Sequence, residues 1–228
     1  MNRALVVGCM IMLAGCGPKK MALSAEATSL QGRTLVVHTW DPVPFADKSF
    51  AKVMKDELDP KEIFGRSEPV ESKVARFQLE DPAIPVADHL ARVLADRYHM
   101  DVKISNRHGT FSGRRENVTT KYPDFDFVLE VKTNYWAVTH NLPSLTKLMV
   151  QCFVQVRFIE RGSGKVFASG LFDAKHEGFG RSPSAKELWD EEAALLKKML
   201  AECSREIGAE AQQELFGQAS KYRPMSSL

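Results

Sequence analysis

The side chains that could catalyse a reaction or hold a metal ion are scattered along this chain of 228 residues. Asp124 and Asp126 share one face of a predicted strand, but a glycosidase needs two carboxyl groups at a defined separation across a cleft. The sequence lacks a nucleophile elbow, a Walker loop and a dinucleotide-binding glycine pattern. The histidines are dispersed, without the close pair and third ligand of a zinc site: His38, His89, His99, His108, His140 and His176. We therefore expect no catalytic residue, no metal site and no cofactor.

The N-terminus has the features of a secretory signal peptide. Arg3 supplies a positive charge, residues 4–14 form an uncharged, mostly apolar run, and small residues follow. The run is shorter than the roughly 20 residues of a transmembrane helix. Leu13-Ala14-Gly15-Cys16 resembles the lipobox of bacterial lipoproteins. That resemblance implies cleavage before Cys16 and acylation, such as palmitoylation, of this cysteine; an ordinary signal peptide with an incidental cysteine is the alternative.

The predicted anchor also indicates a location and a domain organisation. Gly17 follows Cys16 where an Asp is associated with retention in the inner membrane of enteric bacteria, so we expect the periplasmic face of the outer membrane, with the inner membrane as the alternative. Several acyl chains hold a protein stably to a bilayer. The expected organisation is a signal peptide over 1–15, the lipidated cysteine and a flexible tether over 16–31, one periplasmic domain over 32–217 and a tail over 218–228. About 14 flexible residues would give the tether a span near 20 Å.

The composition is that of an ordinary globular protein, with 44% apolar and 26% charged residues. The formal net charge of +2 argues against a dedicated nucleic-acid-binding protein, which would be clearly basic. Beyond the N-terminus, no run of 18 apolar residues predicts a membrane span. The expected partners are a membrane, through the lipid, and another envelope protein.

The order of predicted elements indicates an α+β fold. Strands are expected over 33–40, 102–104, 125–131, 145–159 and 166–172, with a hairpin turn over 160–165. Helices are expected over 45–58, from Asp81 to about Tyr98, and from Ser184 to Phe216; residues 74–79 read as a short strand and 105–122 as an exposed loop. Ser184 and Glu187 fit a capping box at the start of the last helix. We predict a mainly antiparallel sheet with helices packed on one face and a long C-terminal helix.

Three stretches of the body carry a family resemblance. Residues 87–94 form a helix that leads to a short strand, residues 124–131 open a strand, and residues 154–166 match a strand-and-turn pattern in which Ser163 stands where Thr is frequent. Over about residues 33–215 the chain resembles the periplasmic α/β lipoproteins of the curli-secretion and peptidoglycan-synthase-activator type. The resemblance implies a non-enzymatic envelope protein that binds or positions partners.

The two remaining cysteines are Cys152 and Cys203, on a predicted core strand and on the apolar stripe of the last helix. These elements should pack together, and the periplasm is oxidising, so a disulfide is feasible. The alternative is a pair of buried free thiols that act as small hydrophobes.

Two stretches could contact a partner. Tyr135 and Trp136 would be natural anchors if they lie at an exposed hairpin tip, since aromatic residues dominate interface energetics; the alternative is that at least one packs under the sheet edge. A loop with Arg107, Arg114 and Arg115 could contact an anionic group, or could be simply solvated.

Two functions are therefore open. An adaptor should show an exposed apolar patch or an unpaired sheet edge. A binding module for a lipid, glycan or other small ligand should show an enclosed apolar pocket of roughly 300–1,000 Å³. We favour the adaptor, an assembly or transport accessory of the envelope.

Overall fold

The computed structural model describes residues 20–23, 30–41, 43–47, 70–105, 118–141, 144–179 and 181–217. The lipobox with Cys16, most of the helix expected over 45–58, and most of the loop expected over 105–122 lie outside these residues. In the part of the chain that is described, no helix is both long and apolar enough to cross a membrane.

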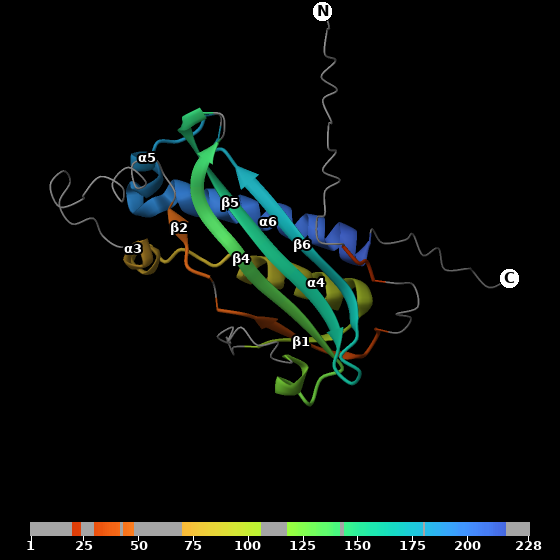
Figure 1. The fold of residues 1–228 in the computed structure, drawn as a ribbon. Helices are drawn as coiled ribbons and strands as arrows, with labels where there is room; N and C mark the ends of the chain where they lie inside the picture. The colour runs from red at the N-terminus through yellow and green to blue at the C-terminus, as the bar shows by residue number, and fades with distance from the viewer. Residues whose placement is uncertain are drawn as a thin grey trace, which may run out of the picture.

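A six-stranded sheet forms the centre of the molecule (Figure 1). Five strands follow the order β3-β1-β4-β5-β6, and β2 pairs with β4 beside that path. β1 is parallel to β3 and β4, and β2 is parallel to β4, whereas β4, β5 and β6 are antiparallel neighbours. The bounds are β1 Thr34–Thr39, β2 Ala46–Asp47, β3 Asp101–Ile104, β4 Phe127–Asn141, β5 Ser144–Glu160 and β6 Val166–His176.

The α+β class is confirmed, and the sheet is mostly antiparallel, as predicted, but it is mixed because β1 and β2 form parallel pairs. β5 and β6 are joined by a short turn, as the hairpin signal at 160–165 predicted; there the Gly164 N–H donates to the Glu160 carbonyl at 2.9 Å. β1 and β3 are instead joined through helices. A strand that returns through a helical crossover runs parallel to its neighbour, so the connection decides the direction of this pair.

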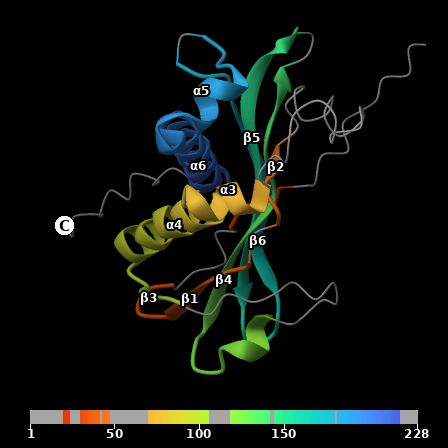
Figure 2. The ribbon, with the colours of Figure 1, turned by 90° about the vertical axis from the view of Figure 1, so that its left-hand side faces the viewer.

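The helices lie together on one side of the sheet (Figure 2). Their bounds are α3 Val70–Arg76, α4 Ala83–Tyr98, α5 Ala185–Trp189 and α6 Ala194–Phe216, with single 3-10 turns at Val118–Lys121 and Glu191–Ala193. The main core lies between this layer and the sheet. The apolar stripe predicted for the last helix is fully buried in it: Leu188, Leu196, Met199, Cys203, Ile207 and Leu215.

A second, smaller cluster lies on the other face of the sheet. Val36 and Val128 belong to it, while their neighbours Leu35 and Leu129 belong to the main core, as the alternation of side chains along a strand requires. The buried members of this outer cluster are Val36, Trp40, Val118, Tyr122, Val128 and Ile159. The sheet is therefore covered on both faces around β1 and the start of β4.

The long helix expected over 184–216 is broken. Its start is as predicted, since the Ser184 side chain and Glu187 form a complete capping box. The chain then leaves the helix, and Glu191, Glu192 and Ala193 take left-handed backbone conformations, with φ of 49°, 57° and 58°. Leu188 and the stripe of α6 reach the core from two separate helices, and α6 ends at Phe216 as predicted.

Two other local predictions are wrong. Ala46 and Asp47, expected to begin a helix, pair as β2 with Ala137 and Val138 of β4. Val74 was expected in a strand over 74–79 but lies in α3, where the Leu79 N–H donates to its carbonyl at 3.0 Å. In both stretches the apolar residues are too few to separate the two periods, and contacts with the core decide the conformation.

Residues 20–23 lie in the stretch expected to be a flexible tether, yet they are bound to the body. Met21 forms an antiparallel bridge with Ser169 of β6, through backbone hydrogen bonds of 2.8 and 2.9 Å. The Leu23 N–H donates to the Leu215 carbonyl of α6 at 2.7 Å. We call residues 20–23 the N-terminal strap.

Candidate functional site: a groove beside strand β3

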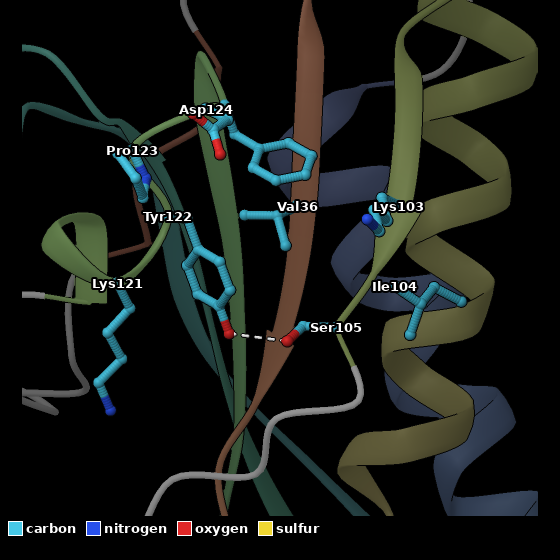
Figure 3. A pocket seen from close by; sticks show the side chains of 9 residues that line it. Val36, Lys103, Ile104, Ser105, Lys121, Tyr122, Pro123 and Asp124 are labelled. Carbon is cyan, nitrogen blue, oxygen red and sulfur yellow. Dashed lines mark hydrogen bonds between the residues drawn. The ribbon is translucent and has the colours of Figure 1, made fainter.

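A groove of about 490 Å³ opens beside β3, on the outer side of the sheet (Figure 3). Its apolar and aromatic lining comes from five side chains of three segments, and two lysines and one aspartate contribute charge around them. The residues that line it are Val36, Lys103, Ile104, Ser105, Lys121, Tyr122, Pro123, Asp124 and Phe125. We call it the β3 groove.

The parallel register of β1 and β3 forms one wall of the groove. Val36 lies opposite Lys103, so their side chains project from the same face of the sheet. Ile104 is 51% exposed, which is unusual for a large apolar residue in a strand. Within the described residues, β3 pairs with β1 alone and forms one end of the strand order. Its other edge therefore offers backbone groups beside an exposed isoleucine.

The segment after the 3-10 turn forms the opposite wall. Tyr122 is buried and holds Phe125 in an edge-on ring contact at 6.4 Å, while the Phe125 N–H donates to the Tyr122 carbonyl at 3.4 Å. Pro123 and Asp124 lie exposed at the turn between them. Figure 3 shows the Tyr122 hydroxyl bonded to Ser105, which follows β3, so this hydrogen bond joins the two walls.

A short chain of hydrogen bonds runs from the groove into the outer cluster. The Tyr122 hydroxyl donates to Ser105 Oγ at 2.9 Å and lies 2.7 Å from Nδ1 of the fully buried His38. Which of the two groups donates in the contact between His38 and Tyr122 depends on the imidazole tautomer.

The Trp40 side chain extends the same cluster along β1. Its ring meets His38 edge-on at 4.8 Å, and its Nε1–H donates to Glu130 Oε1 at 2.7 Å. Glu130 also pairs with Arg157 of β5, at 3.1 Å between Nε and Oε2. Lys121 Nζ lies 4.9 Å from the centre of the Trp40 ring, a favourable cation–π position. The Trp40 ring N–H, the Glu130 carboxylate and the Arg157 guanidinium are thus joined to one another, as the burial of polar groups favours.

A carboxylate clamp fixes β1 beside β4 just behind the groove. Asp126 Oδ2 accepts from the Thr34 N–H at 2.9 Å and from its hydroxyl at 3.0 Å, and Oδ1 faces Arg33 Nη2 at 3.0 Å. The backbone bond from Thr34, together with its hydroxyl and the Arg33 guanidinium, holds the pKa of Asp126 below its usual value. Asp124 and Asp126, expected on one face of a strand, lie in two different places: Asp124 lines the groove and Asp126 forms the clamp.

The structure places the predicted aromatic anchors inside the fold. Tyr135 and Trp136 lie within β4 rather than at its tip, next to a register shift between Thr133 and Tyr135. Trp136 is 2% exposed, and its Nε1–H donates to the Val43 carbonyl at 2.7 Å. Tyr135 is half-buried and meets Phe153 edge-on at 5.7 Å. Trp136 is therefore packed inside the fold, which was the alternative to an exposed anchor. The other candidate contact residues, Arg107, Arg114 and Arg115, lie outside the described residues.

The two cysteines are close but free. Cys152 of β5 and Cys203 of α6 are both fully buried and unbonded. A hydrogen bond with Cys203 and, secondarily, burial raise the pKa of the Cys152 thiol well above its usual range. The elements pack together as expected, with thiols rather than a disulfide between them.

The residues of the β3 groove were not identified from the sequence. One signal in the sequence could have pointed to them. His38 and Trp40 alternate with apolar residues on β1, which places two large aromatic side chains with polar atoms on the outer face of the strand. Ile104 beside Lys103 in a very short strand was the other available signal. No group of three His, Cys, Asp or Glu side chains within the described residues could hold a metal ion.

No family model matches this sequence, and no curated protein matches it. Among solved structures, a hypothetical protein of Chlamydia trachomatis is 12% identical, with a TM-score of 0.39 over 80% of this chain and 98% of that one. A PelC dodecamer of Paraburkholderia phytofirmans is 10% identical, with a TM-score of 0.35 over 81% and 91%. A lipoprotein of Neisseria meningitidis is 9% identical, with a TM-score of 0.28 over 75% and 96%. Similarities of this size assign neither a family nor an activity to this chain.

Proposed function

We propose that this protein is a non-enzymatic, lipid-anchored adaptor of the bacterial envelope, which binds an extended segment of another envelope protein along β3. The observation that carries the proposal is the outer edge of β3, which no strand of the described residues covers, with its half-exposed Ile104 and the adjoining groove. An extended peptide that adds to a sheet edge gains affinity from backbone hydrogen bonds and specificity from pockets for alternate side chains. Edges exposed without such a role favour aggregation, so proteins usually cover or shorten them.

The charges around the groove define the partner's chemistry. Lys103 is exposed and Lys121 is half-buried, and both line the groove. Asp124, at the turn, supplies a carboxylate to the same lining. A partner segment with an apolar side chain for the groove and acidic side chains beside it fits this arrangement.

The membrane anchor is the second part of the proposal. The lipobox supports acylation of Cys16, and Gly17 supports the periplasmic face of the outer membrane. Cells fed an alkyne-tagged fatty acid should label the protein, and Cys16→Ser should abolish the label and release the protein from the membrane pellet. A wild-type protein without label would contradict the anchor and leave the β3 groove to be tested separately.

Photo-crosslinking tests the adaptor function. A photoreactive amino acid at position 104 should give one crosslinked protein of defined mass in intact envelopes, and the same group at the exposed Glu206 of α6 should not. Lys103→Glu should reduce the crosslink from position 104 severalfold. An equal yield from both positions, or no protein crosslink at all, would contradict the proposal.

A small-ligand carrier is the second candidate, favoured by one observation. The groove volume of about 490 Å³ falls within the range of small-molecule sites. Native mass spectrometry of protein released gently from envelopes separates the two functions. A co-purifying lipid or glycan that is lost in Lys103→Glu, with no protein crosslinked at position 104, would favour the carrier.

A further inference from the structure

The N-terminal strap is held by several contacts of different kinds. Besides the bridge to Ser169, Lys20 Nζ lies 2.7 Å from Glu210 Oε1 and 2.9 Å from Glu214 Oε2, one turn apart on α6. The same ammonium lies 4.8 Å from the centre of the Phe172 ring. Leu23 packs against the main core. A strap held by backbone, charged and apolar contacts is part of the body rather than a free linker.

The strap also supplies a hydrogen-bond donor to the C-terminal end of α6. The last four carbonyls of a helix have no partner within it. The Leu23 N–H donates to one of them, that of Leu215, while the Lys20 ammonium stands near the negative end of the α6 dipole. Burial alone would lower the pKa of Lys20, but the bonds to Glu210 and Glu214 raise it, so the ammonium stays charged at neutral pH.

The docked strap shortens the reach of the proposed anchor. Three residues, 17–19, separate Cys16 from Lys20. Four residue steps span at most about 14 Å when fully extended. A free tether of about 14 residues would have a typical span near 20 Å and a far longer maximum.

We infer that the strap holds the body directly against the lipid surface, with β6 and the C-terminal end of α6 towards the bilayer and the β3 groove away from it. This inference rests on the proposed anchor at Cys16. β6 and β3 are the two ends of the strand order. With neighbouring strands about 4.8 Å apart, four steps put the groove about 19 Å further from the membrane than β6. The anchored edge and the binding edge are thus opposite edges of one rigid sheet.

Energy transfer from the protein to a labelled bilayer tests this orientation. The full-length, acylated protein is reconstituted into phosphatidylethanolamine–phosphatidylglycerol vesicles that contain an acceptor lipid. A donor dye is attached at Lys175→Cys on β6 or at Lys103→Cys on β3, both exposed positions, while Cys152 and Cys203 stay buried. We expect transfer from position 175 to exceed transfer from position 103 by about twofold or more, given the separation of the two edges.

A strap-release variant supplies the decisive comparison. Lys20→Glu places a negative charge between Glu210 and Glu214, and Met21→Pro removes the N–H bonded to Ser169. The double variant should lower transfer from position 175 and bring the two positions to similar values. The control Lys186→Glu makes the same charge change on α5, outside the strap contacts, and should retain the difference.

The outcomes separate the anchor from the orientation. Mass spectrometry that finds no acyl chains on the wild-type protein would overturn both the anchor and the inference. Acylated protein with equal transfer from positions 175 and 103, or with a difference that survives strap release, would overturn the orientation and leave the anchor standing.

Discussion

At the scale of single residues, the outer cluster depends on polar side chains that satisfy one another. His38 is fully buried beneath the groove, and its Nδ1 reaches the Tyr122 hydroxyl at 2.7 Å. A buried polar group that loses its partner keeps the cost of its removal from water. The Tyr122 hydroxyl therefore contributes to stability and also joins the two walls of the groove through Ser105.

Removing that hydroxyl should weaken the fold. Tyr122→Phe keeps the ring but leaves His38 Nδ1 without it, so we expect a loss of about 1–3 kcal/mol in the free energy of unfolding. Urea denaturation followed by circular dichroism measures it. Tyr135→Phe is the matched control, because Tyr135 is only half-buried and keeps its ring contact with Phe153, so the change should cost less. Equal losses for both variants would contradict this role of Tyr122.

The Asp126 clamp should make stability depend on pH. Its pKa is lower in the folded protein than the value of about 3.9 expected in the unfolded chain. The charged form therefore stabilises the fold above about pH 4, and this contribution is lost as the pH falls through the lowered pKa. Asp126→Asn should be less stable than the wild type at pH 7, and the difference should shrink at pH 3.

Urea titrations at the two pH values measure this effect. Asp124→Asn, at an exposed position two residues earlier, is the control, and its difference from the wild type should change less with pH. A difference between Asp126→Asn and the wild type that stays constant from pH 7 to pH 3 would refute the role of the clamp.

At the scale of elements, the connections between α4, α5, α6 and the sheet decide how the layers meet. Asp81, buried before α4, accepts from the Ala83 N–H at 3.0 Å and from the Thr133 hydroxyl of β4. Thr133 lies beside the register shift of β4, so this pair ties the start of the helix to the irregular point of the strand. At the other side of the layer, the left-handed residues after α5 turn the chain into α6.

A glycine should lower the conformational cost of the left-handed backbone between α5 and α6. Left-handed conformations cost a residue with a side chain roughly 1–2 kcal/mol, and glycine avoids much of that cost. Glu192→Gly, at an exposed position with φ of 57°, should raise the free energy of unfolding by about 0.5–1 kcal/mol. Chemical denaturation provides the measurement.

The control for this variant is Glu206→Gly, an exposed position within α6. It should lower stability by about 1 kcal/mol, the cost of glycine in a helix interior. A loss of stability from both substitutions would show that residue 192 is helical in solution.

At the scale of the whole molecule, one sheet separates two cores of unequal size. The main core, under the helices, includes the fully buried Leu90 of α4, and the outer cluster includes Trp40. The strands contribute to both cores through alternate residues, so the two faces should unfold together. The β3 edge and the strapped edge should therefore belong to one cooperative unit.

A cavity in the main core should also lower the stability of the outer cluster. Leu90→Ala should cost about 2–5 kcal/mol. In a Trp136→Phe, Trp189→Phe background, Trp40 fluorescence reports the outer cluster, and circular dichroism reports the helices. We expect both signals to shift to the same lower urea midpoint. Separate transitions would contradict a single cooperative unit.

Much of the local structure could be predicted from sequence because it depends on neighbours along the chain. The stripe of α6 and the capping box at Ser184 follow from helical spacing, and the hairpin at 160–165 follows from its turn residues. Failures occurred where the local pattern was short. Ala46 and Val74 lie in such stretches, and a partner strand or helix contact decided their conformation.

The candidate site could not be predicted because its parts come from separate segments. Val36, Lys103 and Tyr122 meet through the parallel pairing of β1 with β3 and through the turn before β4. The sequence contains these residues but not the register that brings them together. For the same reason, the spacing of Tyr135 and Trp136 could not reveal which of them is buried.

The amino-acid sequence alone determined the lipobox, the α+β composition and the faces of the main helices and strands, because each depends on a short range of residues. The tertiary structure decided the parallel partners of β1, the place of β3 at one end of the strand order and the docking of the strap on β6. These features depend on contacts between residues far apart in the chain, where many pairings satisfy the same local pattern and only packing of the whole core selects one.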